Sequence, residues 1–251
     1  RAARRDRHAA PDGARARPGQ YALQGGLRRI LALKSDHDWL FCSPLWTVLC
    51  GGASMSCAAI ILAAGRGERM RPLTDACPKP LLQVRGKPLM QWPLEALARA
   101  GVRDVLVNTA WLGEQIANLF GDRFDLSCAQ GETVPGTAGS GIRMHYSDEG
   151  RDFGGALETA GGIVRALPQL ADPFWVLAGD VFVPGFEFSQ VDVDDFRASG
   201  KLAQIWLVPN PSHNPDGDFG LSDAGLATNQ GTPRLTYSTI GLYRHALFAL
   251  P

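Results

Sequence analysis

The feature that most constrains this chain is an apolar run that leads directly into a glycine-containing turn. Residues 58–64 read A-A-I-I-L-A-A, and the turn G-R-G follows at 65–67. The length and composition of the run predict a buried parallel β-strand, and the two glycines allow a tight turn with bare backbone amides. Such amides form a concave anion site, to which Arg69, Arg71 and Lys79 add positive charge. The stretch therefore predicts a triphosphate-binding site.

The kind of glycine loop follows from its spacing. Met70 stands where a dinucleotide-binding G-x-G-x-x-G turn needs its third glycine, and no Gly-Lys-Ser/Thr follows as a Walker A loop requires. Instead the chain reads L-A-A-G-x-G-E-R-M-x-P-L-T and then P-K-P-L. This arrangement resembles the signature of the sugar-1-phosphate nucleotidylyltransferases. The alternative is an ordinary strand-to-loop turn with solvated arginines.

Composition excludes several classes of protein. The chain has 251 residues, and its 25 Lys and Arg balance 25 Asp and Glu, which argues against a general nucleic-acid or membrane-surface binder. No apolar run approaches the ~20 residues of a membrane-spanning helix. The five cysteines form no Cys-x-x-Cys pair and the histidines are dispersed, so no zinc or disulfide framework is visible. A reducing, cytoplasmic compartment is expected.

The first 54 residues do not share the pattern of the rest. They are rich in Arg and Ala, are broken by Pro and Gly, and contain an apolar stretch at 39–50 that is too short to cross a membrane. An arginine-rich start of this kind also occurs in transit peptides. Because the chain begins with Arg1 and Met55 stands just before the first strand, we expect residues 1–54 to be a non-homologous, disordered or read-through extension. Residues 55–251 are expected to form the functional domain.

From Met55 onward, apolar runs alternate with segments of helical spacing, which predicts an α/β fold. We expect a Rossmann-like, mostly parallel sheet with helices on both faces, and the resemblance implies the nucleotide-diphospho-sugar transferase fold. The ligand should then bind at the carboxyl ends of the strands. Strands are expected at 58–64, 102–108, 143–147, 174–178, 203–208 and 235–242, and helices at 89–100, 112–120 and 157–167.

Asp180 is the clearest single candidate after the loop. It follows F-W-V-L-A-G, so it should emerge at the carboxyl end of a central strand that faces the glycine loop. A carboxylate there can hold Mg²⁺, a hard cation that is usually shared with substrate phosphates. The resemblance gives this Gly-Asp position the same role of metal ligand. The alternative is an aspartate that caps the following turn.

Two cations complete the expected catalytic set of Arg69, Lys79 and Asp180. Lys79 lies between two prolines that stiffen its backbone, and it is expected to meet a phosphate as a point charge. Arg69 is expected to hold the β- and γ-phosphates and to stabilise the departing pyrophosphate. Glu68 either orients Arg69 by ion pairing or contacts the nucleotide. For Arg66 and Arg71, solvated side chains are the simpler expectation.

Residues 146–162 resemble the base-recognition loop of this family and the helix that follows it. The core L-E-T-A-G-G matches, although residues 151–155 are extra or substituted. Its glycines would allow the backbone to approach the base and phosphates, and Glu149 is the candidate acceptor for the base, with a solvated loop acid as the alternative. The implied nucleotide-binding residues are Leu62, Ala63, Ala64, Gly65, Gly67, Glu68, Arg69, Lys79, Glu149, Gly161 and Ala178.

Residues 210–219 (N-P-S-H-N-P-D-G-D-F) carry the expected sugar specificity. In this context G-D-F resembles the branch that acts on N-acetylmuramic acid 1-phosphate, and the mannose-1-phosphate guanylyltransferases are the second branch. A plain turn rich in Asn, Pro, Asp and Gly explains the same composition. Asn108, Glu158 and Asp218 are the expected sugar-binding residues.

The resemblance implies transfer of a uridylyl group from UTP to N-acetylmuramic acid α-1-phosphate, with Mg²⁺ as cofactor and a role in peptidoglycan recycling. Other sugar-1-phosphate nucleotidylyltransferase activities remain open. Members of this family carry a second metal-binding aspartate late in the chain, and no such segment precedes Pro251. A C-terminally truncated, inactive chain or a non-catalytic sugar-nucleotide-binding module is therefore a further expectation.

Overall fold

The computed structural model describes residues 28–31, for their backbone only, and residues 57–126 and 141–249. The apolar stretch 39–50, the start at Met55, and Cys42, Cys50 and Cys128 lie outside these ranges. Within them, every helix is too short or too polar to cross a membrane.

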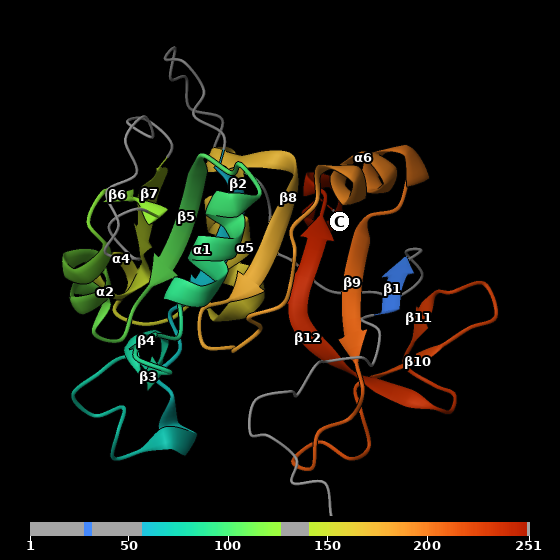
Figure 1. Cartoon of the computed structure of the whole chain (residues 1–251), viewed down its shortest axis with the longest axis horizontal. Helices are drawn as coiled ribbons and strands as arrows, with labels where there is room; N and C mark the ends of the chain where they lie inside the picture. The colour runs from blue at the N-terminus through green and yellow to red at the C-terminus, as the bar shows by residue number, and fades with distance from the viewer. Residues whose placement is uncertain (1–27, 32–56, 127–140, 250–251) are drawn as a thin grey trace, which may run out of the picture.

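One mixed sheet forms the centre of the molecule (Figure 1). Its four inner strands are parallel: β2 pairs with β5 and β8, and β5 pairs with β7. The flanks are antiparallel, because β12 pairs with β8 and β9, β1 with β9, and β6 with β7. The expected α/β fold with a parallel sheet is thus confirmed at the centre of the sheet. In spatial order the strands are β1 (Arg28–Leu31), β9 (Ala203–Val208), β12 (Arg234–Tyr243), β8 (Leu170–Ala178), β2 (Cys57–Ala63), β5 (Asp104–Thr109), β7 (Ile142–Asp148) and β6 (Arg123–Phe124).

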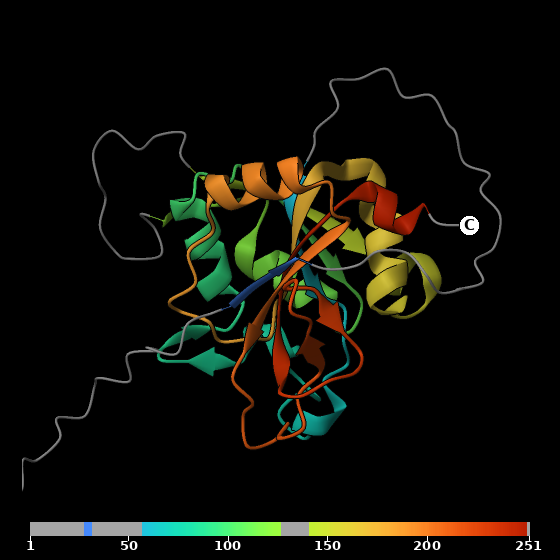
Figure 2. The same ribbon diagram turned by 90° about the vertical axis from the view of Figure 1, so that its right-hand side faces the viewer.

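Helices cover both faces of this sheet, as the alternation of strand side chains requires. In β2, Ala59 and Ile61 face the core under α1 (Gln91–Arg99), α2 (Gly113–Phe120) and α6 (Gln190–Ser199). Ile60 faces the other core, under α5 (Glu158–Ala166). Figure 2 shows the strands edge-on between the two helical layers.

The sequence pattern missed the short elements and α6. Only Phe196 of α6 is buried, so the helix carries little apolar periodicity, and its beginning is marked by Ser189, whose side chain accepts a hydrogen bond from the Val191 amide at 3.1 Å. The helix expected at 157–167 ends one residue earlier, at Ala166, and continues as a 3₁₀ turn. The short elements are β3 (Gln83–Val84), β4 (Lys87–Pro88), β10 (Phe219–Leu221), β11 (Ala227–Thr228), α4 (Glu149–Phe153), η1 (Glu68–Met70), η2 (Lys79–Leu81), η3 (Leu167–Gln169) and η4 (His245–Phe248).

Part of the expected N-terminal extension is ordered in the structure. Arg28–Leu31 forms strand β1 and pairs antiparallel with β9, with Ile30 opposite Ile205. The expectation that residues 1–54 are a non-homologous, disordered or read-through extension stays a prediction. The expected boundary at residue 55 lies outside the described ranges and stays a prediction.

Candidate active site

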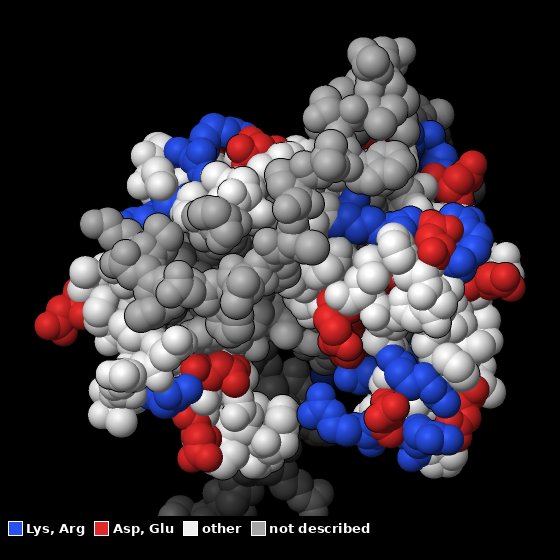
Figure 3. Space-filling model, turned by 180° about the vertical axis from the view of Figure 1, so that it is seen from behind, with Lys and Arg blue, Asp and Glu red and all other residues white. Residues whose placement is uncertain are grey.

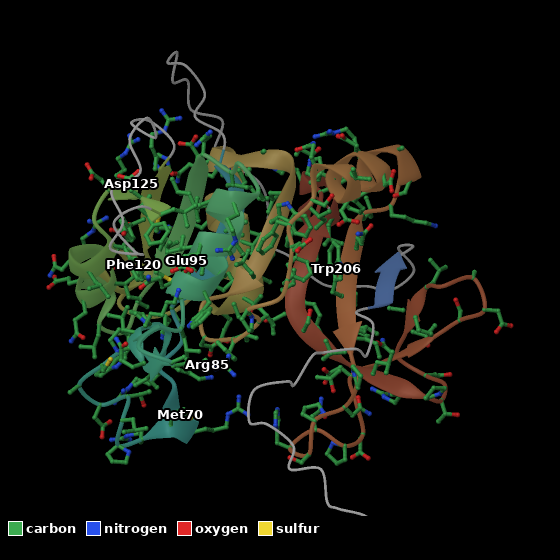
Figure 4. All side chains as sticks on the ribbon, in the orientation of Figure 1. Met70, Arg85, Glu95, Phe120, Asp125 and Trp206 are labelled. Carbon is green, nitrogen blue, oxygen red and sulfur yellow. The ribbon has the colours of Figure 1, made fainter. Side chains whose placement is uncertain are left out.

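The four parallel strands end at one edge of the sheet, at the bottom of Figure 1, because Ala63 pairs with Thr109 and Thr109 with Asp148. The glycine loop continues from β2 at this edge. Below it lies the β3–β4 hairpin, whose turn at Arg85 and Gly86 has φ values of 52° and 82°, as a two-residue hairpin needs. Figure 4 shows Arg85 and Met70 beneath the lower ends of the central strands.

The two glycines of the loop have different roles. Gly67 has φ 68°, a left-handed conformation that favours glycine, and a Cβ there would lie 3.0 Å from Thr74 Cγ2. Its carbonyl accepts hydrogen bonds from Met70 N at 2.9 Å and Thr74 Oγ1 at 2.8 Å. Gly65 is exposed and a Cβ there would meet nothing within 4 Å. Gly67 therefore shapes the turn, whereas Gly65 leaves open space at its rim.

Arg66 is not the solvated side chain that we expected. Its guanidinium stacks over the Trp111 ring, with Cζ 3.5 Å from the ring centroid, and donates to the Thr74 carbonyl at 2.8 Å. Trp111 Nε1 donates to the same carbonyl at 3.0 Å. Planar stacking of this kind stabilises a guanidinium without removing its charge. Arg66 therefore fastens the loop to the segment after β5, which sequence spacing could not reveal.

Lys79 and Asp180 meet at the end of β8. Lys79 Nζ lies 2.6 Å from Asp180 Oδ2, and about a third of each side chain is exposed (27% and 32%). Pro78 and Pro80 are buried on either side of the lysine. Gly179 is closely packed, since a Cβ there would lie 3.1 Å from Ile61 Cγ2, and its amide donates to Leu62 O at 2.9 Å. This packing holds Asp180 against the end of β2.

Arg69 and Glu68 lie exposed on η1. The described residues show neither an ion pair between these two side chains nor any other carboxylate partner for Arg69. Arg71 differs, because its Nε pairs with Asp75 Oδ1 at 2.8 Å. Figure 3 shows Lys and Arg side chains gathered over this segment at the lower edge of the molecule. Arg69 is thus a cation available to an anionic ligand.

Glu149 and Asn108 lie inside the protein rather than on a loop surface. Glu149 is 0% exposed and Asn108 2%. Glu149 accepts hydrogen bonds from Asn108 Nδ2 at 2.7 Å and from the Leu157 amide at 2.7 Å. The alternative of a solvated loop acid is therefore wrong, and in this conformation neither side chain reaches a surface that a base or sugar could touch.

The other residues expected to bind the nucleotide or the sugar lie in two separate parts of this edge of the sheet. Glu158 is exposed at the start of α5 with φ 61°, and Gly161 is partly exposed one turn later. Ala178 ends β8 beside the loop. Asp218 belongs to the segment after β9, and both its oxygens accept hydrogen bonds, from Asn214 Nδ2 at 3.0 Å and from Tyr237 N at 2.8 Å. Asp218 therefore closes a turn, which was the alternative to its expected sugar contact.

Thr239 is a residue that sequence reasoning missed. It has φ 63°, an outlier for a β-branched residue, at a shift of register in β12. It precedes the Ile240–Leu177 pair and so lies level with the end of β8. Its Oγ1 is buried and has no hydrogen-bond partner among the residues that the structure describes. Strained residues of this kind concentrate at functional sites, but no sequence signal marks this one.

The donor set at Asp180 suits a divalent cation shared with a substrate. Asp180 presents a partly exposed carboxylate, of which Oδ2 contacts Lys79. Mg²⁺ is commonly bound by one or two carboxylates together with substrate phosphates and water. Among the described residues no group of three or more His, Cys, Asp or Glu is placed to hold a metal. The residues present therefore fit a cation that Asp180 holds together with phosphate oxygens.

Comparison with known proteins places the chain in a family. The family model described as nucleotidyl transferase matches residues 58–232. The chain is 46% identical over 198 residues to N-acetylmuramate alpha-1-phosphate uridylyltransferase of Neisseria meningitidis, with 76% of each chain covered. It is 36% identical over 135 residues to UTP--glucose-1-phosphate uridylyltransferase of Synechocystis, covering 50% of this chain and 31% of that protein.

A third relative and a solved structure agree with this placement. Mannose-1-phosphate guanylyltransferase catalytic subunit beta of Drosophila pseudoobscura is 34% identical over 158 residues, 61% of this chain and 38% of that protein. The crystal structure of a putative glucose-1-phosphate thymidylyltransferase from Bacillus anthracis has a TM-score of 0.56 at 19% identity and covers 76% of this chain and 72% of that one, which supports the fold. The chain belongs to the nucleotidyl transferase family, in agreement with its resemblance to the sugar-1-phosphate nucleotidylyltransferases.

Proposed function

We propose that this protein transfers a uridylyl group from UTP to N-acetylmuramic acid α-1-phosphate, producing the UDP-sugar and pyrophosphate. The observation that carries the proposal is the 46% identity over 198 residues to the Neisseria meningitidis enzyme of that name. The loop at 65–67, Lys79 and Asp180 lie at one edge of the sheet, which suits a nucleoside triphosphate. The reaction would serve peptidoglycan recycling in the cytoplasm.

The chemistry needs no covalent enzyme intermediate. A phosphate oxygen of the sugar phosphate attacks the α-phosphorus of UTP; the new P–O bond forms as the bond from the α-phosphorus to the β-phosphate oxygen breaks, and pyrophosphate leaves with that electron pair. Lys79 binds phosphate oxygens as a point charge and keeps the two reactants in line, which is the main contribution an enzyme makes to such a transfer. Arg69 binds the β- and γ-phosphates and stabilises the charge that develops on the leaving group.

Asp180 would hold the Mg²⁺ ion. When bound, the cation neutralises charge on the phosphate oxygens and orients the triphosphate. The Lys79–Asp180 ion pair holds the carboxylate towards the loop in the absence of substrate. The exposed backbone at Gly65 lets the triphosphate approach the loop amides closely.

Mannose-1-phosphate guanylyltransferase is the second candidate, because a relative of that name is 34% identical over 158 residues. The two candidates share the site and the reaction type and differ in the base and the sugar. The two candidate functions should therefore differ in the residues that select the base and the sugar, and substrate competition can test this directly.

The test is pyrophosphate release by the full chain with Mg²⁺ present. Each of UTP, GTP, dTTP and CTP is offered with N-acetylmuramic acid 1-phosphate and with mannose 1-phosphate. Release confined to UTP with the muramic substrate, lost in Asp180→Ala and retained in Asp194→Ala, supports the proposal; Asp194 is an exposed aspartate on α6 whose charge pairs with Arg197. Release confined to GTP with mannose 1-phosphate favours the second candidate. Silence with every pair contradicts both and favours the non-catalytic sugar-nucleotide-binding module.

A further inference from the structure

A buried hydrogen-bond chain runs beneath the candidate site. Asn108 Oδ1 accepts from the Ala63 amide at 2.8 Å, and Asn108 Nδ2 donates to Glu149 Oε1 at 2.7 Å. Glu149 Oε2 then accepts from the Leu157 amide at 2.7 Å. No Lys or Arg of the described residues pairs with Glu149. Burying a carboxylate without a cation costs folding free energy, which the hydrogen bonds to that carboxylate must offset.

The donors and acceptors of these three hydrogen bonds fit together in one arrangement only. Glu149 faces two N–H donors, so both of its oxygens must accept. Asn108 faces one N–H donor and one carboxylate, so its amide oxygen must point to Ala63 and its NH₂ group to Glu149. Glutamine at position 149 would leave one donor without an acceptor, and aspartate at position 108 would set two carboxylates against each other. The residue type at position 108 therefore depends on the one at position 149, and the reverse holds as well.

These hydrogen bonds connect the two segments that would contact the nucleotide and the sugar. Ala63 lies two residues before Gly65, and Leu157 immediately precedes Glu158, the residue at φ 61° that begins α5. α5 also rests directly on the pair, because a Cβ at Gly162 would lie 2.5 Å from Glu149 Oε1 and 2.6 Å from Asn108 Nδ2. The pair therefore determines how close the start of α5 comes to the glycine loop.

We propose that Asn108 and Glu149 are positioning residues that hold the strained start of α5, with the exposed side chain of Glu158, in register with the glycine loop. They act through Ala63 and Leu157 and do not touch the substrate themselves. The inference rests on the proposed function for the identity of the substrates. The Asn108–Glu149 hydrogen bond itself does not depend on that identity. Preorganisation of this kind is what places reactants in line for transfer.

A charge swap tests the proposal. In Glu149→Gln and in Asn108→Asp, one buried donor or acceptor loses its partner, and we expect kcat/KM to fall about ten-fold or more in each. In the double variant, the new carboxylate at position 108 accepts from Ala63 N and from the new carboxamide NH₂ group at position 149. The oxygen of that carboxamide accepts from Leu157 N. The net charge is unchanged and the three hydrogen bonds of the wild type are restored, so we expect the double variant to recover most of the loss.

Three measurements are made on the full chain with Mg²⁺: steady-state kinetics, calorimetric binding of UTP and of GTP, and hydrogen exchange at the Ala63 and Leu157 amides. Phe174→Leu is the control, because Phe174 lies in the core under α5 and takes no part in the site. The single variants should lose amide protection and nucleotide affinity, whereas Phe174→Leu should lower only the melting temperature.

Single variants that melt earlier yet keep wild-type KM, nucleotide affinity and protection of both amides would overturn the proposal, as would a double variant no better than the singles. Failure of the proposed function looks different, because the wild type would then release no pyrophosphate from any pair. In that case amide protection and nucleotide affinity across the same variants still decide the role of the pair.

Discussion

Lys79 Nζ lies 2.6 Å from Asp180 Oδ2, although 101 positions separate the two residues in the chain. The contact joins the basic segment after the glycine loop to the end of β8, and it brings opposite charges to one partly exposed place. In the absence of substrate each residue neutralises the other. A bound triphosphate with its cation would offer both residues stronger partners, since phosphate attracts the ammonium and the cation attracts the carboxylate.

The first prediction concerns this pair. Asp180→Asn keeps the side-chain volume but removes the charge that holds a cation, so pyrophosphate release should fall about 10²–10³-fold. Because Lys79 loses its partner, triphosphate binding without added metal should change little or increase. Calorimetric titration with UTP, with and without Mg²⁺, checks both parts. Wild-type turnover in Asp180→Asn would rule out Asp180 as the metal ligand.

The second prediction separates the glycines of the loop. Gly67→Ala forces a left-handed alanine against Thr74 and should lower the free energy of unfolding by about 1–2 kcal/mol. Gly65→Ala meets no atom within 4 Å and should leave that free energy unchanged, while it weakens nucleotide binding by crowding the phosphates. Urea unfolding and UTP binding of both variants make the comparison. Equal destabilisation by the two substitutions would contradict it.

The third prediction compares two exposed arginines on the same segment. Arg69 has no ion-pair partner among the described residues, whereas Arg71 pairs with Asp75. Arg69→Ala should therefore lower kcat/KM about 10–100-fold, because it removes a cation from the leaving phosphates. Arg71→Ala is the matched control and should stay within about three-fold of the wild type, as exposed ion pairs contribute little. A larger loss in Arg71→Ala than in Arg69→Ala would reverse the assignment.

The fourth prediction concerns acid stability at the amino ends of the parallel strands. The guanidinium of Arg143, 2.7 Å from Asp104, and then the imidazole of His145 lower the pKa of the Asp104 carboxyl. Because the folded pKa lies below the unfolded value of about 3.9, this stabilisation is present above pH ~4 and is lost as the pH falls through the folded pKa.

Asp104→Asn should accordingly be less stable than the wild type at pH 7, and the difference should shrink as the pH falls below 4. Urea unfolding of both proteins at pH 7, 5 and 3 measures it. A difference that is independent of pH would mean that packing around Asp104, rather than its charge, stabilises this end of the sheet.

The local sequence pattern predicted those strands of the sheet that are buried on both faces. The runs at 58–64 and 203–208 were expected as strands and form β2 and β9, because a strand buried on both faces is mostly apolar. α6 escaped prediction because only Phe196 of its ten residues is buried, so the helix has almost no apolar periodicity. The antiparallel placement of β12 between β8 and β9 has no local signature, since strand order depends on long-range pairing.

For this protein, the sequence alone determined the family, and it predicted the glycine loop, Lys79 and Asp180 as the site, because all of these rest on residue types at short, characteristic spacing. Only the tertiary structure decided what each side chain touches. Arg66 stacks on Trp111, and Glu149 is buried against Asn108 rather than solvated. Thr239 of β12 adopts a left-handed conformation level with the end of β8. Such contacts join residues tens of positions apart, and a linear pattern carries no record of which distant groups share a donor, an acceptor or a surface.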